Sequence, residues 1–163
     1  MAELPDRTLV RDDGRRELFE HFLRFFLNLL PNTLGPYRDS VDPIWDRSAE
    51  LFGSFAANRG LAAGEVIEEV QILREAIIRC LFQDPPLGAA GAMGLREILR
   101  LNSVVDRLVL HASIGHTDAL FFALFQGSGS PETLSDDVRW ELREQLQALS
   151  SEAEAFEMSP DLV

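Results

Sequence analysis

Two apolar-patterned segments, separated by a Pro- and Gly-rich break, constrain the fold of this chain most. The first, residues 61 to 82, repeats apolar side chains at intervals of three or four, as a helix with one buried face does. These side chains are Val66, Val70, Leu73, Ile77 and Leu81. The second, residues 95 to 126, is long enough for one helix of roughly 45 Å. Because two prolines and three glycines lie between residues 83 and 94, we expect two separate helices.

The N-terminal third of the chain predicts two further helices. Residues 15 to 30 are apolar around more than half of a helical circumference, and Pro31 is expected to end that helix. At Asp42 and Pro43, a capping carboxylate precedes a proline suited to a first helical turn, so a second helix is expected to begin there. Residues 58 to 60 end in glycine and supply its C-terminal stop.

The C-terminal segment predicts a fifth, acidic helix after a flexible joint at residues 127 to 131. Residues 127 to 163 contain nine acidic side chains but only two arginines. An apolar side chain recurs every three or four residues, which makes this helix amphipathic. Such a helix suits helix-in-groove binding or self-association. The candidate partner-binding residues are Val138, Leu142, Leu146 and Leu149.

Together these patterns predict an all-α, single-domain bundle of about five helices with a four-helix-bundle or globin-like core. The 163 residues suffice to bury a core without disulfides or metals. We expect a flexible N-terminus over residues 1 to 13, a helical regulatory bundle over 14 to 126, and the joint with its acidic helix over 127 to 163.

Charge and cysteine content exclude several functional classes. The net charge is −12 and all 15 basic residues are arginines, which disfavours nucleic acid as a partner and removes lysine-based catalysis. The single cysteine, Cys80, rules out an intrachain disulfide and favours a reducing compartment. Since it lies in the apolar stripe of residues 61 to 82, we expect a packed thiol.

The N-terminus lacks the apolar core of a signal peptide. The most apolar run, residues 19 to 30, is too short and too often interrupted to span a membrane. We therefore expect a cytoplasmic protein that does not enter the membrane.

Few side chains have a pattern that favours catalysis or metal binding. His111 and His116 are five residues apart, whereas paired helical ligands are three or four apart, and no Glu-x-x-His motif occurs. We expect no metal site, no catalytic residue and no cofactor. His111 is the candidate axial ligand if the protein binds haem. Asn102 and Asp106 share a helix face and are expected to form a buried polar pair that hydrogen-bonds to a neighbouring helix and fixes its register.

An alternative function is that of a small-molecule or haem sensor with a cavity among phenylalanines. Ordinary core packing explains these residues as well. They are Phe22, Phe26, Phe52, Phe55, Phe121 and Phe122.

Residues 59 to 79 contain the elements GL, EEV and LREAI in order, and residues 99 to 107 contain LN followed by VD. In these motifs the chain resembles the RsbRD N-terminal-domain family, the helical input modules of RsbT co-antagonist proteins in stressosomes and of bacterial sensor histidine kinases. The resemblance implies an all-helical bundle, cytoplasmic bacterial signalling and dimerisation, and it supplies no catalytic residue.

The leading hypothesis is therefore a non-catalytic signalling module that acts by protein–protein interaction as a homodimer. The expected partner is a kinase, a phosphatase or a STAS-type regulator.

Overall fold

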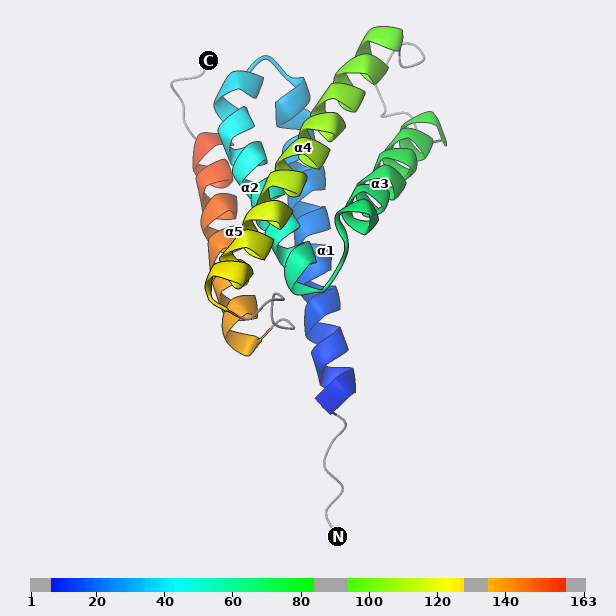
Figure 1. The fold of residues 1–163 in the computed structure, drawn as a ribbon. Coiled ribbons are helices and arrows are strands. Elements are labelled where there is room, and N and C mark those ends of the chain that lie inside the picture. The colour runs from blue at the N-terminus through cyan, green and yellow to red at the C-terminus, as the bar shows by residue number, and fades with distance from the viewer. Residues whose placement is uncertain (1–6, 84–93, 128–134, 158–163) are drawn as a thin grey trace.

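The structure, a computed structural model, describes residues 7–83, 94–127 and 135–157. Five helices and no strand occur in these three ranges, which confirms the predicted all-α bundle (Figure 1). The helices are α1 (Arg7–Leu34), α2 (Arg38–Asn58), α3 (Ala63–Gln83), α4 (Leu95–Phe125) and α5 (Asp136–Glu157). Most of the predicted joint at residues 127 to 131, and the break between α3 and α4, lie outside the described residues.

Three predicted helix boundaries are wrong, namely the start and the end of α1 and the start of α2. α1 begins at Arg7, inside the segment expected to be a flexible N-terminus, and continues through Pro31 to Leu34. α2 begins at Arg38 and contains Pro43. Each proline costs the backbone hydrogen bond that its missing N–H would have donated, so the packing of the rest of the helix has to offset this cost. Asp42 consequently lies inside α2 and does not cap it.

An aromatic cluster joins α1 to α2 in the core. Phe22 and Phe55 are fully buried, with ring centroids 5.5 Å apart, and Phe52 lies 5.5 Å from Phe22 in an edge-to-face arrangement. Phe26 packs between Phe52 and Trp45. These geometries are the preferred ones for aromatic pairs and add to the apolar area buried. The cluster confirms ordinary packing for four of the six phenylalanines that the sequence singles out.

α2 is the central helix and contacts each of the other four. It crosses α4 at a pair of glycines, Gly53 and Gly115, where the two backbones meet without intervening side chains. A Cβ atom at Gly53 would lie 2.7 Å from the carbonyl carbon of Ala112, and one at Gly115 would lie 2.6 Å from that of Glu50. The Ser54 hydroxyl also donates to the carbonyl oxygen of Gly115 at 3.1 Å. This close crossing fixes the position of α4 on the bundle.

α3 is only partly covered by the rest of the chain. Val66 and Val70 are buried, whereas Leu73, Ile77 and the rest of the predicted stripe are half-buried. Cys80 is exposed, so the expectation of a packed thiol is wrong. Cys80 lies near the end of α3, ten residues beyond Val70, the last buried residue of that helix.

α5 packs against α1 and α2 of its own bundle. Leu142, Leu146 and Leu149 are buried in the core and Val138 is half-buried, so the apolar face predicted to receive a partner is covered by the chain itself. An ion pair between Arg47 and Glu152, 2.7 Å apart, supports the same packing. The predicted amphipathic helix is confirmed, but the prediction that its apolar face is free to bind a partner is wrong.

Candidate functional site

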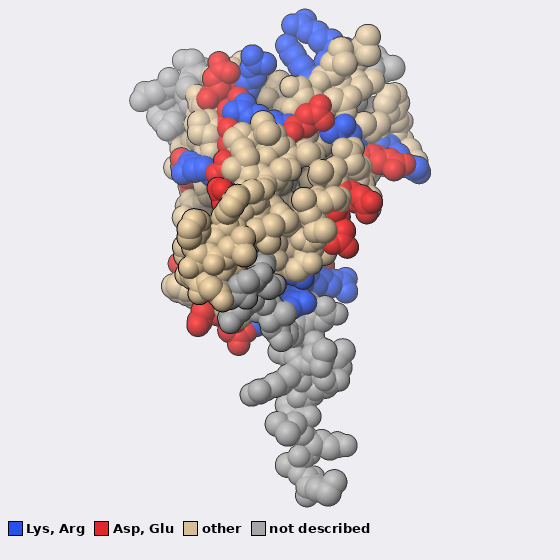
Figure 2. Space-filling model, viewed as in Figure 1, with Lys and Arg blue, Asp and Glu red and all other residues tan. Residues whose placement is uncertain are grey.

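The feature of this structure that internal packing does not explain is an exposed apolar surface on the C-terminal half of α4. We name it the α4 face; its members are Leu110, Ile114, Leu120, Phe121, Phe122, Leu124 and Phe125. Figure 2 shows a broad uncharged area over this part of the molecule. Asp118 is the only Asp, Glu, Lys or Arg residue between positions 108 and 125.

The α4 face exists because this helix is apolar on two sides and the chain covers only one. The covered side is turned toward α2 and includes Leu108, Ala112, Gly115 and the buried His116. The side chains on the opposite side are exposed, and no helix of the described residues covers them. The three phenylalanines Phe121, Phe122 and Phe125 are 56%, 65% and 88% exposed.

The size of the α4 face is unusual for a side that faces water. At 150–250 Å² per aromatic side chain, the three phenylalanines expose roughly 400 Å². Burying a whole aliphatic side chain is worth about 1.5–3 kcal/mol at about 25 cal/mol per Å², and the ratio of these two values gives the area of one side chain. The exposed parts of the four aliphatic members therefore add on the order of 200 Å². A total of roughly 600 Å² is at the upper end for the largest apolar patch of a monomer, and patches of that size are often functional.

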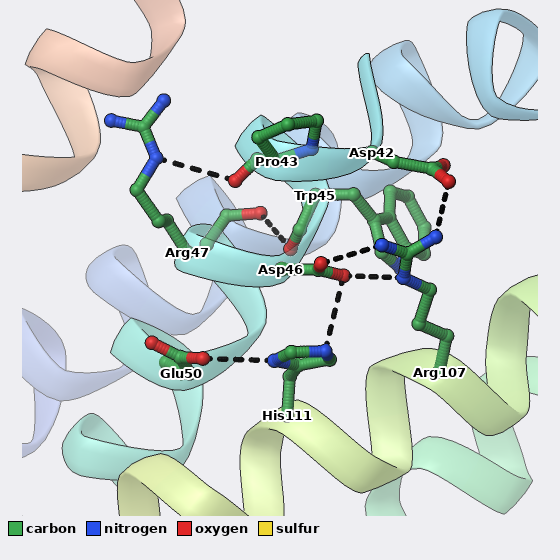
Figure 3. Close-up of polar contacts among 9 residues, drawn as sticks. Asp42, Pro43, Trp45, Asp46, Arg47, Glu50, Arg107 and His111 are labelled. Atoms are coloured by element: carbon green, nitrogen blue, oxygen red, sulfur yellow. Dashed lines mark hydrogen bonds and ion pairs between the residues drawn. The ribbon is translucent and has the colours of Figure 1, made fainter. Parts of the chain in front are cut away.

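A cluster of charged side chains beside the crossing sets the rotation of α4 against α2 (Figure 3). The Arg107 guanidinium donates to both carboxylate oxygens of Asp46, from Nε and Nη2, each at 2.6 Å, and also donates to Asp42. The pKa of Arg107 is raised above its ordinary value, chiefly by the hydrogen bond to Asp46 and next by the contact with Asp42, with partial burial acting in the opposite direction. The bidentate geometry favours one orientation of the side chain.

His111 extends the same cluster by one helical turn. Its Nδ1 lies 2.8 Å from Glu50 Oε1 and its Nε2 lies 3.3 Å from Asp46 Oδ1. With both ring nitrogens facing carboxylates, neither is directed at an open position where haem iron could bind. The cluster therefore acts as a clamp between α2 and α4, and we call it the α2–α4 clamp.

The other histidines are also placed by packing. His116 Nε2 lies 2.8 Å from the carbonyl oxygen of Leu61, in the loop between α2 and α3. His21 lines a groove of about 590 Å³ between α1 and α5 together with Arg24 and Gln147. Within the described ranges, no group of three or more His, Cys, Asp or Glu side chains is arranged to hold a metal ion.

The predicted phenylalanine cavity is wrong in two respects. Phe121 and Phe122 are on the surface, far from full burial, and so cannot line a core cavity with the other four. Beside Phe26 and Phe52 the internal space is about 10 Å³, too small for an organic ligand. A larger recess, about 710 Å³, lies between the α1–α2 turn and α4, where Arg107 is already held by Asp42.

The polar pair expected at Asn102 and Asp106 is half correct. Asp106 forms an ion pair with Arg74 of α3, which links the neighbouring helix as predicted. Its carboxylate is largely exposed, so the contact is not buried. A solvent-exposed pair of this kind contributes little to stability.

α4 is also the one described helix long and apolar enough to cross a membrane by length and composition. Only 28% of its most apolar window is buried, which sets it apart from an ordinary core helix. The buried side carries Arg107 and His111 in contact with acidic residues of α2, so α4 belongs to the bundle along much of its length.

Comparison of the chain with known protein families gives no match, and neither do comparisons with curated proteins and with solved structures. The resemblance to the RsbRD N-terminal-domain family thus stays a prediction from the motifs in residues 59 to 107.

Proposed function

We propose that this protein is a non-catalytic regulatory module that acts by binding a protein partner through the α4 face. The observation that carries the proposal is the exposure of Phe121, Phe122 and Phe125 on one side of a helix whose other side is clamped to the bundle. Apolar surface exposed to water is costly, and aromatic side chains gathered on one face are enriched at the centres of protein interfaces.

The α2–α4 clamp supports a surface role for α4. Arg107 and His111 hold the helix by one side, and Gly53 and Gly115 bring it into backbone contact with α2. A recognition surface on a rigid helix loses little conformational entropy when a partner binds. The arrangement thus favours a preformed docking surface.

A membrane is a poorer fit than a protein for the α4 face. Helices that lie in a membrane surface usually carry Lys or Arg along the polar side, which attract anionic lipids. Between residues 108 and 125 the chain has no Lys or Arg, and its net charge is −12. A cytoplasmic location, as expected from the sequence, accords with this proposal.

The partner class expected from the sequence is a kinase, a phosphatase or a STAS-type regulator. To test the proposal, the tagged protein is isolated from the cells that naturally produce it, in three forms. These are the wild type, the double variant Phe121→Asp with Phe125→Asp, and the control Ile72→Asp. Ile72 is a matched control because it is 68% exposed, yet it lies on α3 outside the α4 face.

We expect one partner at near-stoichiometric amount with the wild type and with Ile72→Asp, and its loss with the double variant. Circular dichroism must show equal helix content in all three. The same partner at the same level in the double variant would rule out the α4 face, and so would a wild type that is recovered as a monomer, with neither another protein nor a second copy of this chain bound.

A further inference from the structure

Resting on the proposed function, we infer that the partner covering the α4 face is the same face of a second copy of this chain. The proposal assigns a twofold-symmetric homodimer in which α4 of one protomer packs against α4 of the other. Three observations carry it, namely the charge distribution, the exposed area and the arrangement of side chains along α4.

Charge restricts where two copies can meet. At a net charge of −12, two copies repel each other over most approaches. The last half of α4 carries one acidic residue, Asp118, and no basic one, so contact there brings few like charges together. The face also offers no charges by which a differently charged partner would be selected, whereas an uncharged apolar face is complementary to itself.

The exposed area matches the requirement of a dimer. Each copy exposes roughly 600 Å² of apolar surface on the α4 face, so a pair that covered all of it would bury about 1,200 Å² before any polar rim is counted, which is the lower limit for standard stable interfaces. Among the described residues this is the patch with the most strongly exposed phenylalanines.

The side chains form one continuous stripe on α4. Leu110, Ile114, Phe121 and Leu124 are separated by helical intervals, with Thr117 at the middle of the stripe. In a twofold interface the same patch is used by both protomers, and residues near the axis face their own counterparts. The symmetry axis should therefore pass close to Thr117, an exposed residue.

The first test is sedimentation velocity on the purified full chain across a range of concentrations. We expect a species of twice 18.3 kDa for the wild type and for Ile72→Asp. Phe121→Asp is expected to weaken the dimer at least tenfold, because it places one carboxylate from each protomer in an apolar interface. Phe121→Leu, which keeps the surface apolar, should remain dimeric.

The second test locates the axis by disulfide formation. Thr117→Cys is made together with Cys80→Ser, which removes the exposed native thiol. Ser151→Cys in the same background is the control, since Ser151 is exposed on α5. Mild oxidation should give a covalent dimer from the Thr117→Cys protein and little from the control.

Three results would overturn the inference. They are a monomeric wild type at all concentrations, a Phe121→Asp protein that dimerises like the wild type, and equal cross-linking from both cysteine positions. A monomer that floats with neutral or anionic lipid vesicles, and loses this with Phe121→Asp, would assign the face to a membrane. A monomer that still binds another protein through Phe121 in cells would reject the second copy while leaving the proposed function intact.

Discussion

Replacement of Gly115 by alanine tests the crossing that places the α4 face on the surface. A new Cβ atom would overlap the Glu50 carbonyl group, whose carbon would lie 2.6 Å away. In an unhindered helix the same change stabilises by about 1 kcal/mol, because glycine is a poor helix former. Overpacking costs about 1–3 kcal/mol or more, and the upper end applies here because the obstacle is helical backbone of α2. The net expectation is a loss of about 2 kcal/mol.

Urea denaturation followed by circular dichroism measures this loss. In thermal denaturation of a chain of this size, the same loss of about 2 kcal/mol corresponds to a fall in Tm of roughly 4–8 °C. Gly64→Ala is the matched control, because Gly64 lies in α3 with open space around the position of a Cβ atom. It should be neutral or stabilising by up to about 1 kcal/mol. If Gly115→Ala is as stable as the wild type, the close crossing of α2 and α4 is wrong.

Four other predictions follow from the same contacts. Arg107→Ala should lower the free energy of unfolding by about 1–2 kcal/mol at neutral pH, as measured by urea titration. The control Arg16→Ala, which removes an exposed ion pair, should lower it by less than about 0.5 kcal/mol. Equal losses from the two variants would contradict the α2–α4 clamp. Because the pKa of Arg107 is raised, the Arg107 contribution is fully present at neutral pH and is lost only as the pH rises through that raised value. Leu146→Ala should lower the free energy of unfolding by about 2–4 kcal/mol in the same assay, because the Leu146 side chain of α5 is buried in the core. A change below about 0.5 kcal/mol would mean that α5 does not pack on the bundle. Cys80 should react fully with a thiol reagent in the native protein, and reaction that needs urea would show it to be covered. Added haemin should give no stoichiometric Soret band, and a band that disappears with His111→Ala would revive the haem hypothesis.

Local patterns predicted the helices well because they depend on neighbours three or four residues apart. The apolar stripe of α3 and the amphipathic pattern of α5 were both visible in the sequence. Where the sequence-based prediction is wrong, contacts between helices determine the helix end or the burial of the side chain. Pro31 was expected to end α1, but packing carries the helix one turn further. The stripe around Leu146 was correctly recognised as apolar, yet only the fold reveals that α1 and α2 cover it.

The α2–α4 clamp and the glycine crossing could not be predicted from local patterns. Arg107 meets Asp46 across 61 positions of sequence, and Gly53 meets Gly115 across a similar interval, so no local period marks either contact. The α4 face does leave a signal in the sequence. Residues 108 to 125 are apolar on both sides of the helix, more than one core contact requires, whereas the sequence-based alternatives for Phe121 were core packing and an interior cavity.

The most direct test of the central claim, that protein covers the α4 face, is photo-crosslinking in living cells. A photoreactive amino acid is introduced at Phe121 in one variant and at Ser151 in another, and both are irradiated in the cells that produce the protein. We predict a discrete cross-linked product from position 121 whose mass is the sum of this chain and one protein partner, a second copy or another chain, and no such product from position 151. No product from position 121, or the same products from both positions, would contradict the account.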